Sequence, residues 1–250
     1  MCLANVSAIT LDLDDTLWPF APSVERAERV LHKWLLQHAP GTASVLTSPQ
    51  KLHELRSATE RERPELAHDL KSLRLESIRM ALTLSDEDAG LAGAAYEVFF
   101  AERQRVELYE DVLPALQWLA RRYPLVAVSN GNGCLKAAGV QQFFQADLRA
   151  STFGCAKPDA AIFQAAAALA GVAADRVLHV GDDAELDIAG ALAAGLQAAW
   201  IVRSSSQTSV QWVHGDRRPQ LIFPDLRALC RMLEVGSRLC CANRLRARFP

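Results

Sequence analysis

The sequence lacks the features that mark membrane, secreted and nucleic-acid-binding proteins. No apolar run approaches the ~20 residues needed to span a bilayer, and the start of the chain has no basic region of the kind that opens a secretory signal. The formal net charge is only −2 at pH 7, so no basic footprint for nucleic acid is indicated. We therefore expect a cytoplasmic protein that binds neither a membrane nor a nucleic acid.

The cysteines and lysines also narrow the choices. The six cysteines show neither a zinc-ligand nor a CxxC spacing, which favours reduced thiols in a cytosolic protein. Lysine is scarce, because only five of the 27 basic residues are lysines. Apolar residues are abundant: 50% of the 250 residues are hydrophobic, enough for a sizeable core. This length suits one large domain or a main domain with an insertion.

The stretch 8–17 joins an apolar run to three acidic residues and a threonine. Apolar and polar residues alternate from Ile9 to Leu13, which predicts a strand with Asp12 at its C-terminal tip and Asp14 two residues beyond. Two carboxylates ~4 Å apart repel by roughly 4 kcal/mol at an effective dielectric constant of ~20. The acids must therefore be solvated, protonated or bridged by a cation. An ordinary acidic turn and a cation site both remain open for this stretch.

Residues 18–107 contain no convincing strand. Their apolar spacing and their proline and serine starts predict four helices separated by short loops, one of which covers 42–49. We expect these helices from Ser23 to about Pro40, over 50–61, from Pro64 through Ala81, and from Ser85 to about Glu107.

Strands and helices alternate from residue 108 onward, which predicts right-handed βαβ units and a parallel sheet covered on both faces. Strands are expected at 125–128, 148–151, 177–180 and 198–202, and helices over 111–122, 135–140, 158–170, 188–195 and 225–233. The chain is thus divided into a core of 1–17 and 108–236, a helical insertion of 18–107, and a basic, frayed tail of 237–250.

Three of the predicted strands end in polar clusters, and Lys157 lies in a loop of the same layer. In an open α/β sheet, ligands bind outside the carboxyl ends of the strands, so these clusters should converge on one crevice. Each cluster alone is also what an ordinary turn or strand-end cap shows, and only their joint order favours a site. The clusters are Asp12 with Asp14, Ser129 with Asn130, and Asp182 with Asp183.

This inventory suits an oxyanion held with a divalent cation. Mg²⁺ takes octahedral oxygen ligands, commonly one or two carboxylates together with phosphate and water. Asp12 and Asp182 supply such carboxylates, and the main-chain carbonyl of Asp14 is a third oxygen. Ser129 and nearby backbone N–H groups suit phosphate oxygens, and Lys157 suits the charge that the metal leaves uncompensated.

Taken together, the motifs resemble those of the haloacid dehalogenase superfamily of phosphohydrolases. The motifs are Asp12-x-Asp14-x-Thr16, Ser129, Lys157-Pro158, and Gly181-Asp182-Asp183-x-x-x-Asp187. The resemblance implies an α/β fold in which a Rossmann-like parallel sheet core carries an inserted four-helix cap domain. More closely, segments 10–17, 129–132 and 179–183 resemble the branch containing a bacterial flavin mononucleotide and phosphoribitylaminouracil phosphatase.

The resemblance implies an Mg²⁺-dependent phosphatase that hydrolyses a small organic phosphate monoester of this kind. Asp12 would be the nucleophile that forms an aspartyl-phosphate, and Asp14 the general acid and base. The implied phosphate-binding residues are Ser129, Asn130 and Lys157, the metal ligands Asp12, Asp14 and Asp182, and the supporting residues Thr16, Asp183 and Asp187. Whether Asp182 or Asp187 binds the metal directly stays open, and we expect a monomer or a homodimer.

Two other functions fit part of the pattern. A carbon–halogen hydrolase of the same fold uses the aspartate nucleophile, but a halide leaves unprotonated and does not need Asp14. A non-enzymatic aspartyl-phosphate switch combines similar residues in about half the length. Substrate choice is expected to lie in the insertion, where a planar substrate would stack on an aromatic ring. Most of these rings, such as Phe20 and Phe99, are equally suited to a core, and His68 and Arg74 are expected on a solvent-exposed face.

Overall fold

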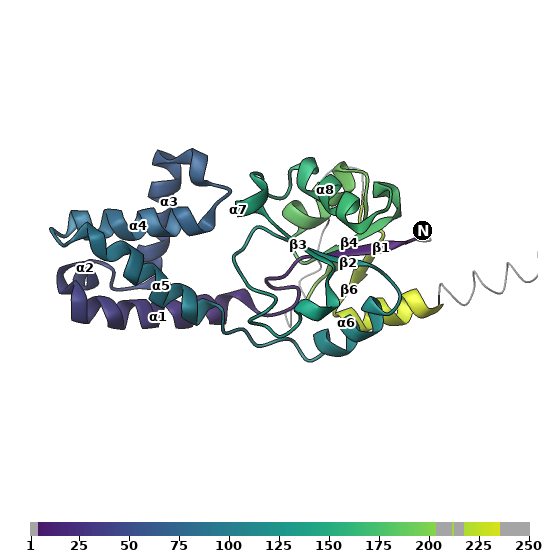
Figure 1. The fold of residues 1–250 in the computed structure, drawn as a ribbon, viewed down its shortest axis with the longest axis horizontal. Helices are drawn as coiled ribbons and strands as arrows, with labels where there is room; N and C mark the ends of the chain where they lie inside the picture. The colour runs from purple at the N-terminus through teal and green to yellow at the C-terminus, as the bar shows by residue number, and fades with distance from the viewer. Residues whose placement is uncertain (1–4, 204–211, 213–217, 236–250) are drawn as a thin grey trace, which may run out of the picture.

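A computed structural model describes residues 5–203, 212 and 218–235. Its centre is a six-stranded parallel sheet with the order β3-β2-β1-β4-β5-β6 (Figure 1). The predicted α/β fold is therefore confirmed. The strands are β1 (Ala8–Leu11), β2 (Leu125–Ser129), β3 (Ala146–Arg149), β4 (Val177–Gly181), β5 (Gln197–Ile201) and β6 (Leu221–Phe223).

The register of the sheet brings three strand ends together. Leu11 of β1 lies opposite Ala127 of β2 on one side and Val180 of β4 on the other. Every residue of β1, β2, β4 and β5 is buried, as expected for strands that helices cover on both faces. The residues that follow β1, β2 and β4 therefore meet at one edge of the sheet.

Helices cover the sheet from two sides (Figure 1). One face packs Ile9 and Leu11 against α6 (Val112–Ala120) and against a helical segment at 226–235. The other face packs mainly against α8 (Ala160–Ala170) and α9 (Gly190–Ala193), and α9 directly follows a π-helical turn at Ala184–Ala189. A short helix, α7 (Ala150–Phe153), follows β3.

The segment between β1 and α6 forms a separate helical body beyond one end of the sheet (Figure 1). We call this body the cap; its own core includes Leu31, Ile78 and Tyr96 and contains no residue of the sheet. The division of the chain at 17/18 and 107/108 stays a prediction. The cap helices are α1 (Phe20–His38), α2 (Pro40–Val45), α3 (Pro49–Glu62), α4 (Leu70–Leu84) and α5 (Ala92–Arg103).

Several local expectations were wrong. Residues 42–49 were expected to form a loop, but α2 extends to Val45, with Pro40 at its first turn, where the missing N–H costs nothing. A single helix was expected from Pro64, but a 3-10 turn at Pro64–Leu66 precedes α4 as a separate element. Residues 135–140 form turns and not a helix, and Gly139 adopts a φ of +71° there.

The sheet also has one more strand than we expected. β6 is a three-residue edge strand whose residues are only partly buried or exposed, so its short pattern gives little strand signal. The predicted tail, 237–250, lies outside the described residues. Among the described helices, none combines the length and the hydropathy that crossing a membrane requires.

Candidate active site

The site begins where β1 ends. The backbone N–H of Asp12 donates to the carbonyl of Val180 at 2.9 Å, which extends the ladder and holds Asp12 at the edge of the sheet. Asp12 is 6% exposed and Lys157, from the loop before α8, is 4% exposed. The Lys157 ammonium group donates to Asp12 and, at 2.5 Å, to Oδ1 of Asp187. Because these charges are buried, each depends on the others to replace the water it has lost.

Asp187 connects Lys157 to a buried histidine. Its Oδ1 accepts from His179 Nε2 at 3.1 Å as well as from Lys157, and its Oδ2 accepts from the backbone N–H of Asp183 at 3.1 Å. Burial lowers the pKa of His179, so the ring is neutral and its Nε2 carries the proton that Asp187 accepts. The other ring nitrogen, Nδ1, lies 2.8 Å from Thr10 Oγ1, which donates to it. Thr10 thus fixes the ring through Nδ1, and the ring orients Asp187 through Nε2.

The carboxylates of the site outnumber its cations. Burial raises the pKa of Asp12, although Lys157 opposes this. Burial also favours the neutral form of Asp187, but Lys157 and His179 outweigh it and lower the pKa of Asp187. For Asp182, burial and the neighbouring carboxylates of Asp187 and Asp15 raise the pKa to about 7. An additional positive charge would therefore stabilise the ionised cluster.

Three of these carboxylates form a cluster that could hold a metal ion: one oxygen each from Asp12, Asp182 and Asp187, all within 4.8 Å of one another. Both oxygens of Asp187 already accept hydrogen bonds, whereas Asp182 accepts one from Thr16 Oγ1, at 3.2 Å, through Oδ1. The Trp200 indole N–H donates to the Asp182 carbonyl at 2.7 Å and fixes that loop. A donor set made only of oxygens fits a hard divalent cation such as Mg²⁺.

Asp14 lies on the side of the site that faces the cap. Its Oδ1 accepts from Trp18 Nε1 at 2.7 Å and from the Arg103 guanidinium at 2.5 Å. A Cβ added to Gly131 would clash with Oδ2 of Asp14 and lie 3.3 Å from Ser129 Oγ. A side chain at position 131 would therefore have to displace the Asp14 carboxylate, and this close approach brings the loop after β2 against Asp14.

The other predicted residues lie around this centre. Ser129 is 1% exposed and its Oγ accepts from the Gly131 N–H at 3.0 Å. Asn130 uses both polar atoms of its side chain on the backbone of Lys157, each at 2.8 Å, and so positions the lysine. Asp183 accepts from the N–H groups of Glu185 and Leu186 and caps the turn that carries Asp187.

Four residues at the site were not identified from the sequence. Arg103 reaches Asp14 from the last turn of α5, and no motif near it indicates this. Arg203 donates to the carbonyl of Thr16 and pairs with Asp111. Thr10 and His179 were placed on strands without a role. His179 could have been noticed, because it is the one polar side chain within the buried strand Val177–Gly181.

An aspartate and a lysine in contact, with an acidic cluster beside them at the carboxyl edge of a parallel sheet, are typical of hydrolases that use an aspartate nucleophile. The sequence profile of the haloacid dehalogenase-like hydrolases matches residues 6–195. The chain belongs to this family.

Known proteins similar to the chain include phosphatases and a dehalogenase. It is 34% identical over 214 residues to the 5-amino-6-(5-phospho-D-ribitylamino)uracil phosphatase YigB of Escherichia coli (strain K12), covering 84% of this chain and 89% of that protein. A phosphoserine phosphatase of Thermus thermophilus is 34% identical over 113 residues, 43% of this chain and 45% of that protein. The solved structure of a 2-haloacid dehalogenase from Pseudomonas syringae superposes with a TM-score of 0.82 at 34% identity, covering 92% and 98% of the two chains. The predicted family is confirmed by the family match, and the predicted enzyme class, a phosphoric monoester hydrolase, by the two phosphatases.

Proposed function

We propose that the chain is an Mg²⁺-dependent cytoplasmic phosphatase that hydrolyses a small organic phosphate monoester through an aspartyl-phosphate. The observation that carries this proposal is the buried contact of Lys157 with both Asp12 and Asp187, next to Asp182. Such a group presents one nucleophilic carboxylate beside an ammonium group, together with acids that suit a divalent cation. These are the positive charges that a transferring phosphoryl group needs.

The reaction would proceed in two displacements at phosphorus, the first by Asp12 and the second by water. A carboxylate oxygen of Asp12 forms a bond to phosphorus as the bond from phosphorus to the leaving oxygen breaks, and Asp14 gives that oxygen a proton. Water then attacks phosphorus, Asp14 takes a proton from it, and Asp12 is released. Because Trp18 and Arg103 hold Oδ1 of Asp14, its Oδ2 is the atom available for both proton transfers.

The remaining residues hold the phosphoryl group and its charge. Ser129 Oγ and the backbone N–H groups of the loop that follows it would donate to the phosphoryl oxygens, while the Lys157 ammonium offsets their charge. Asp12 and Asp182, with the main-chain carbonyl of Asp14, would hold Mg²⁺. The bound metal would supply positive charge that neutralises the nucleophile and the phosphoryl oxygens. Asp187, Asp183 and Thr16 would orient these groups from behind.

Within this class we propose a riboflavin-pathway substrate, phosphoribitylaminouracil, with flavin mononucleotide as the other candidate. Support comes from the 34% identity to YigB, which extends over most of both chains. The segments 10–17, 129–132 and 179–183, which first indicated this branch, all lie at or beside the carboxyl edge of the sheet.

Carbon–halogen hydrolysis is the second candidate, because the Pseudomonas syringae structure is described as a 2-haloacid dehalogenase. A halide leaves without a proton, so that reaction would give no task to Asp14. It also gives no task to Asp182, whose carboxylate lies in the same acidic cluster as the nucleophile Asp12. The acids that surround the nucleophile therefore favour phosphate esters.

The test is a side-by-side assay of the purified full-length chain. Phosphate release would be measured from phosphoribitylaminouracil, flavin mononucleotide and several sugar phosphates, and chloride release from 2-chloropropionate, each with MgCl₂ and with EDTA. We expect phosphate release only with MgCl₂ and no chloride release. Chloride release in EDTA would establish the dehalogenase instead. An aspartyl-phosphate that persists for minutes without turnover would indicate a switch.

A further inference from the structure

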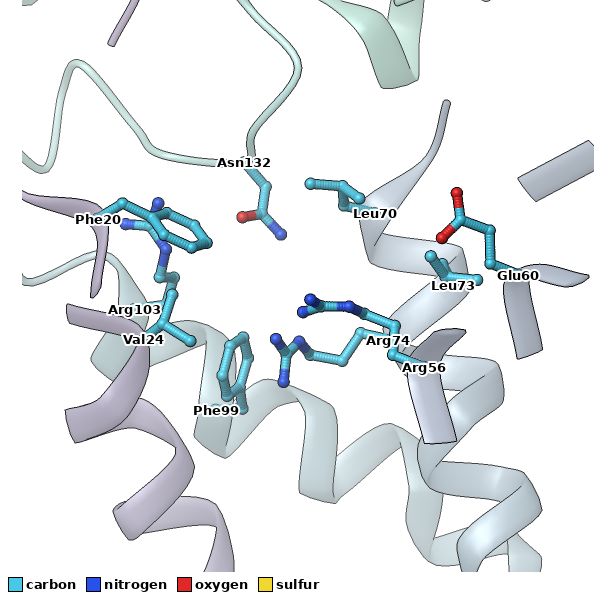
Figure 2. A pocket seen from close by; sticks show the side chains of 10 residues that line it. All are labelled: Phe20, Val24, Arg56, Glu60, Leu70, Leu73, Arg74, Phe99, Arg103 and Asn132. Carbon is cyan, nitrogen blue, oxygen red and sulfur yellow. The ribbon is translucent and has the colours of Figure 1, made fainter. Parts of the chain in front are cut away.

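A cavity of about 170 Å³ lies within the cap and opens against the loop after β2 (Figure 2). Helices α1, α3, α4 and α5 line it, and Asn132 borders it from the loop with its side-chain amide turned inward. Arg103 lines the cavity and also bonds Asp14, the residue assigned above to the leaving oxygen. The cavity is therefore on the leaving-group side of the site.

Arg103 has an unused donor at this cavity. The residue is 1% exposed, and its Nη1 nitrogen is buried without a hydrogen-bond partner among the described residues. A buried donor without a partner costs free energy that a ligand oxygen would restore. The guanidinium lies 5.2 Å from the centre of the Phe20 ring, so an oxygen bound at Arg103 would lie beside an aromatic face.

Arg74 presents a second donor from the other side of the cavity. It was expected on a solvent-exposed face but is 8% exposed, because it stacks over the Phe99 ring at 3.9 Å and pairs with Glu28 at 3.5 Å. Burial and the nearby Arg56 guanidinium lower the pKa of Arg74 to about 10, so it stays charged at neutral pH. Figure 2 shows the Arg56 and Arg74 guanidinium groups directed into the cavity.

The residues that line the cavity thus favour a ligand of a particular chemistry and size. Three guanidinium groups line the cavity, two of which also pair with Glu28 and Asp14, so its wall is rich in hydrogen-bond donors and favours a ligand rich in acceptors. Phe20, Phe99 and the planar guanidinium groups favour a flat ligand. The volume of about 170 Å³ is below the ~300–1,000 Å³ of pockets for drug-sized ligands, which suits one ring better than three fused rings.

We propose that this cavity binds the leaving group through a single planar ring bearing carbonyl oxygens, and that Arg74 is the residue that selects it. The inference rests on the proposed phosphatase function and narrows its substrate: a uracil-sized head attached to the phosphate by a sugar-alcohol chain enters the cap, and the three-ring flavin head does not. Arg103 donates to the same ring from the side of Asp14.

The test compares three phosphate esters that differ in the head. Phosphoribitylaminouracil carries one ring with carbonyl groups, flavin mononucleotide carries three fused rings, and ribose 5-phosphate carries none. In the unmodified protein, kcat/KM for the one-ring ester should exceed that for each of the others by at least about tenfold. In Arg74→Met, the ratio of the one-ring ester to ribose 5-phosphate should fall by at least about tenfold, because the donor is lost while the apolar stem remains.

The controls separate recognition from folding. Arg79→Met makes the same change on the exposed side of α4 and should leave the ratio unchanged. Because Arg74→Met leaves the Glu28 carboxylate without its partner, the variant would be repeated with Glu28→Gln, and both would be checked by circular dichroism.

Two outcomes would overturn the inference: a ratio unchanged in the folded Arg74→Met proteins, or flavin mononucleotide turned over as efficiently as the one-ring ester. Release of phosphate from none of the three esters, with MgCl₂ present, would instead overturn the proposed function itself.

Discussion

The carboxyl edge of the sheet and the cavity in the cap differ in whether their buried polar groups have hydrogen-bond partners. At the edge, Lys157 is bonded to Asp12 and Asp187, and both ring nitrogens of His179 are used. In the cavity, an Arg103 nitrogen has no partner within the described part of the chain. At the edge, Lys157 and His179 are bonded before a substrate arrives, whereas in the cavity a substrate would supply the missing hydrogen-bond partner. Chemistry is therefore preorganised in the core, and selection is left to the cap.

This difference predicts how each region responds to substitution. Breaking a buried ion pair leaves an uncompensated charge and costs about 3–5 kcal/mol, so changes at the edge should affect both stability and rate. Changes in the cavity should alter the preference among substrates. The four predictions below test this contrast, beginning with the largest effect.

Asp12→Asn should lower turnover of any phosphate ester by at least about 10⁴-fold, because the amide cannot form the acyl-phosphate bond. Rates would be measured by phosphate release at saturating substrate and MgCl₂. Circular dichroism should show an unchanged fold, since Lys157 keeps Asp187 as a partner. If turnover stayed within tenfold of the unmodified protein, phosphoryl transfer would not pass through Asp12.

Lys157→Arg should lower kcat by about 10²- to 10³-fold, because a planar guanidinium cannot reproduce a compact ammonium charge in contact with two carboxylates. The matched control is Lys136→Arg, since Lys136 is exposed and outside this network. Steady-state kinetics on one ester would compare the two. Equal kcat values for both variants would mean that Lys157 acts only as a structural cation.

Gly131→Ala should lower kcat by about 10- to 10²-fold without changing a charged residue, because displacing Asp14 by about 1 Å spoils the alignment for proton transfer. The reason is the clash of the new methyl group with Oδ2 of Asp14. Kinetics with an ester of a poor leaving group would show the loss most clearly. An unimpaired kcat would indicate that the loop yields and that Asp14 does not depend on it.

Gly93→Ala should have the smallest effect and the opposite sign, stabilising the cap by about 0.5–1 kcal/mol. Gly93 lies in α5, is exposed, and a Cβ there would meet nothing within 4 Å. Urea unfolding followed by circular dichroism would measure the shift, and kcat should not change. A destabilised variant would show that this face of α5 is not free in the folded chain.

The sequence allowed the catalytic edge to be predicted because local signals coincide there. The alternation from Ile9 to Leu13 and the apolar strands before Ser129 and Asp182 mark strand ends, and parallel strands must end together. Arg74 and Arg103 could not be assigned this way. α4 has polar residues on several sides and α5 has apolar residues on several sides, so spacing does not show which face of either helix another helix will cover. That depends on how the helices of the cap pack.

Two smaller details of the fold also could not be predicted from the sequence. α2 has only 6 residues and begins at Pro40. A proline is common both at the first turn of a helix and just after the end of one, so Pro40 alone does not predict a new helix. That Asn130 binds phosphate stays a prediction, but the sequence did not indicate that its side-chain amide bonds the backbone of Lys157, 27 positions further along. Pairings over such separations leave no local trace in the sequence.

Arg203 connects the two places at which the chain passes between the core and the cap. Its guanidinium donates to the carbonyl of Thr16, where the chain leaves the core, and pairs with Asp111, where the chain has returned. The N–H of Tyr109 closes the same crossing by donating to the carbonyl of Leu17 at 3.1 Å. Both connections of the cap therefore pass through one bonded junction. Insertions, deletions or exchanges between those two points would leave the strand order and the contacts among Asp12, Lys157 and Asp187 intact, so the helices can change while the nucleophile keeps its surroundings. Arg103, which reaches Asp14 from α5, is the cap residue that such a change would have to retain.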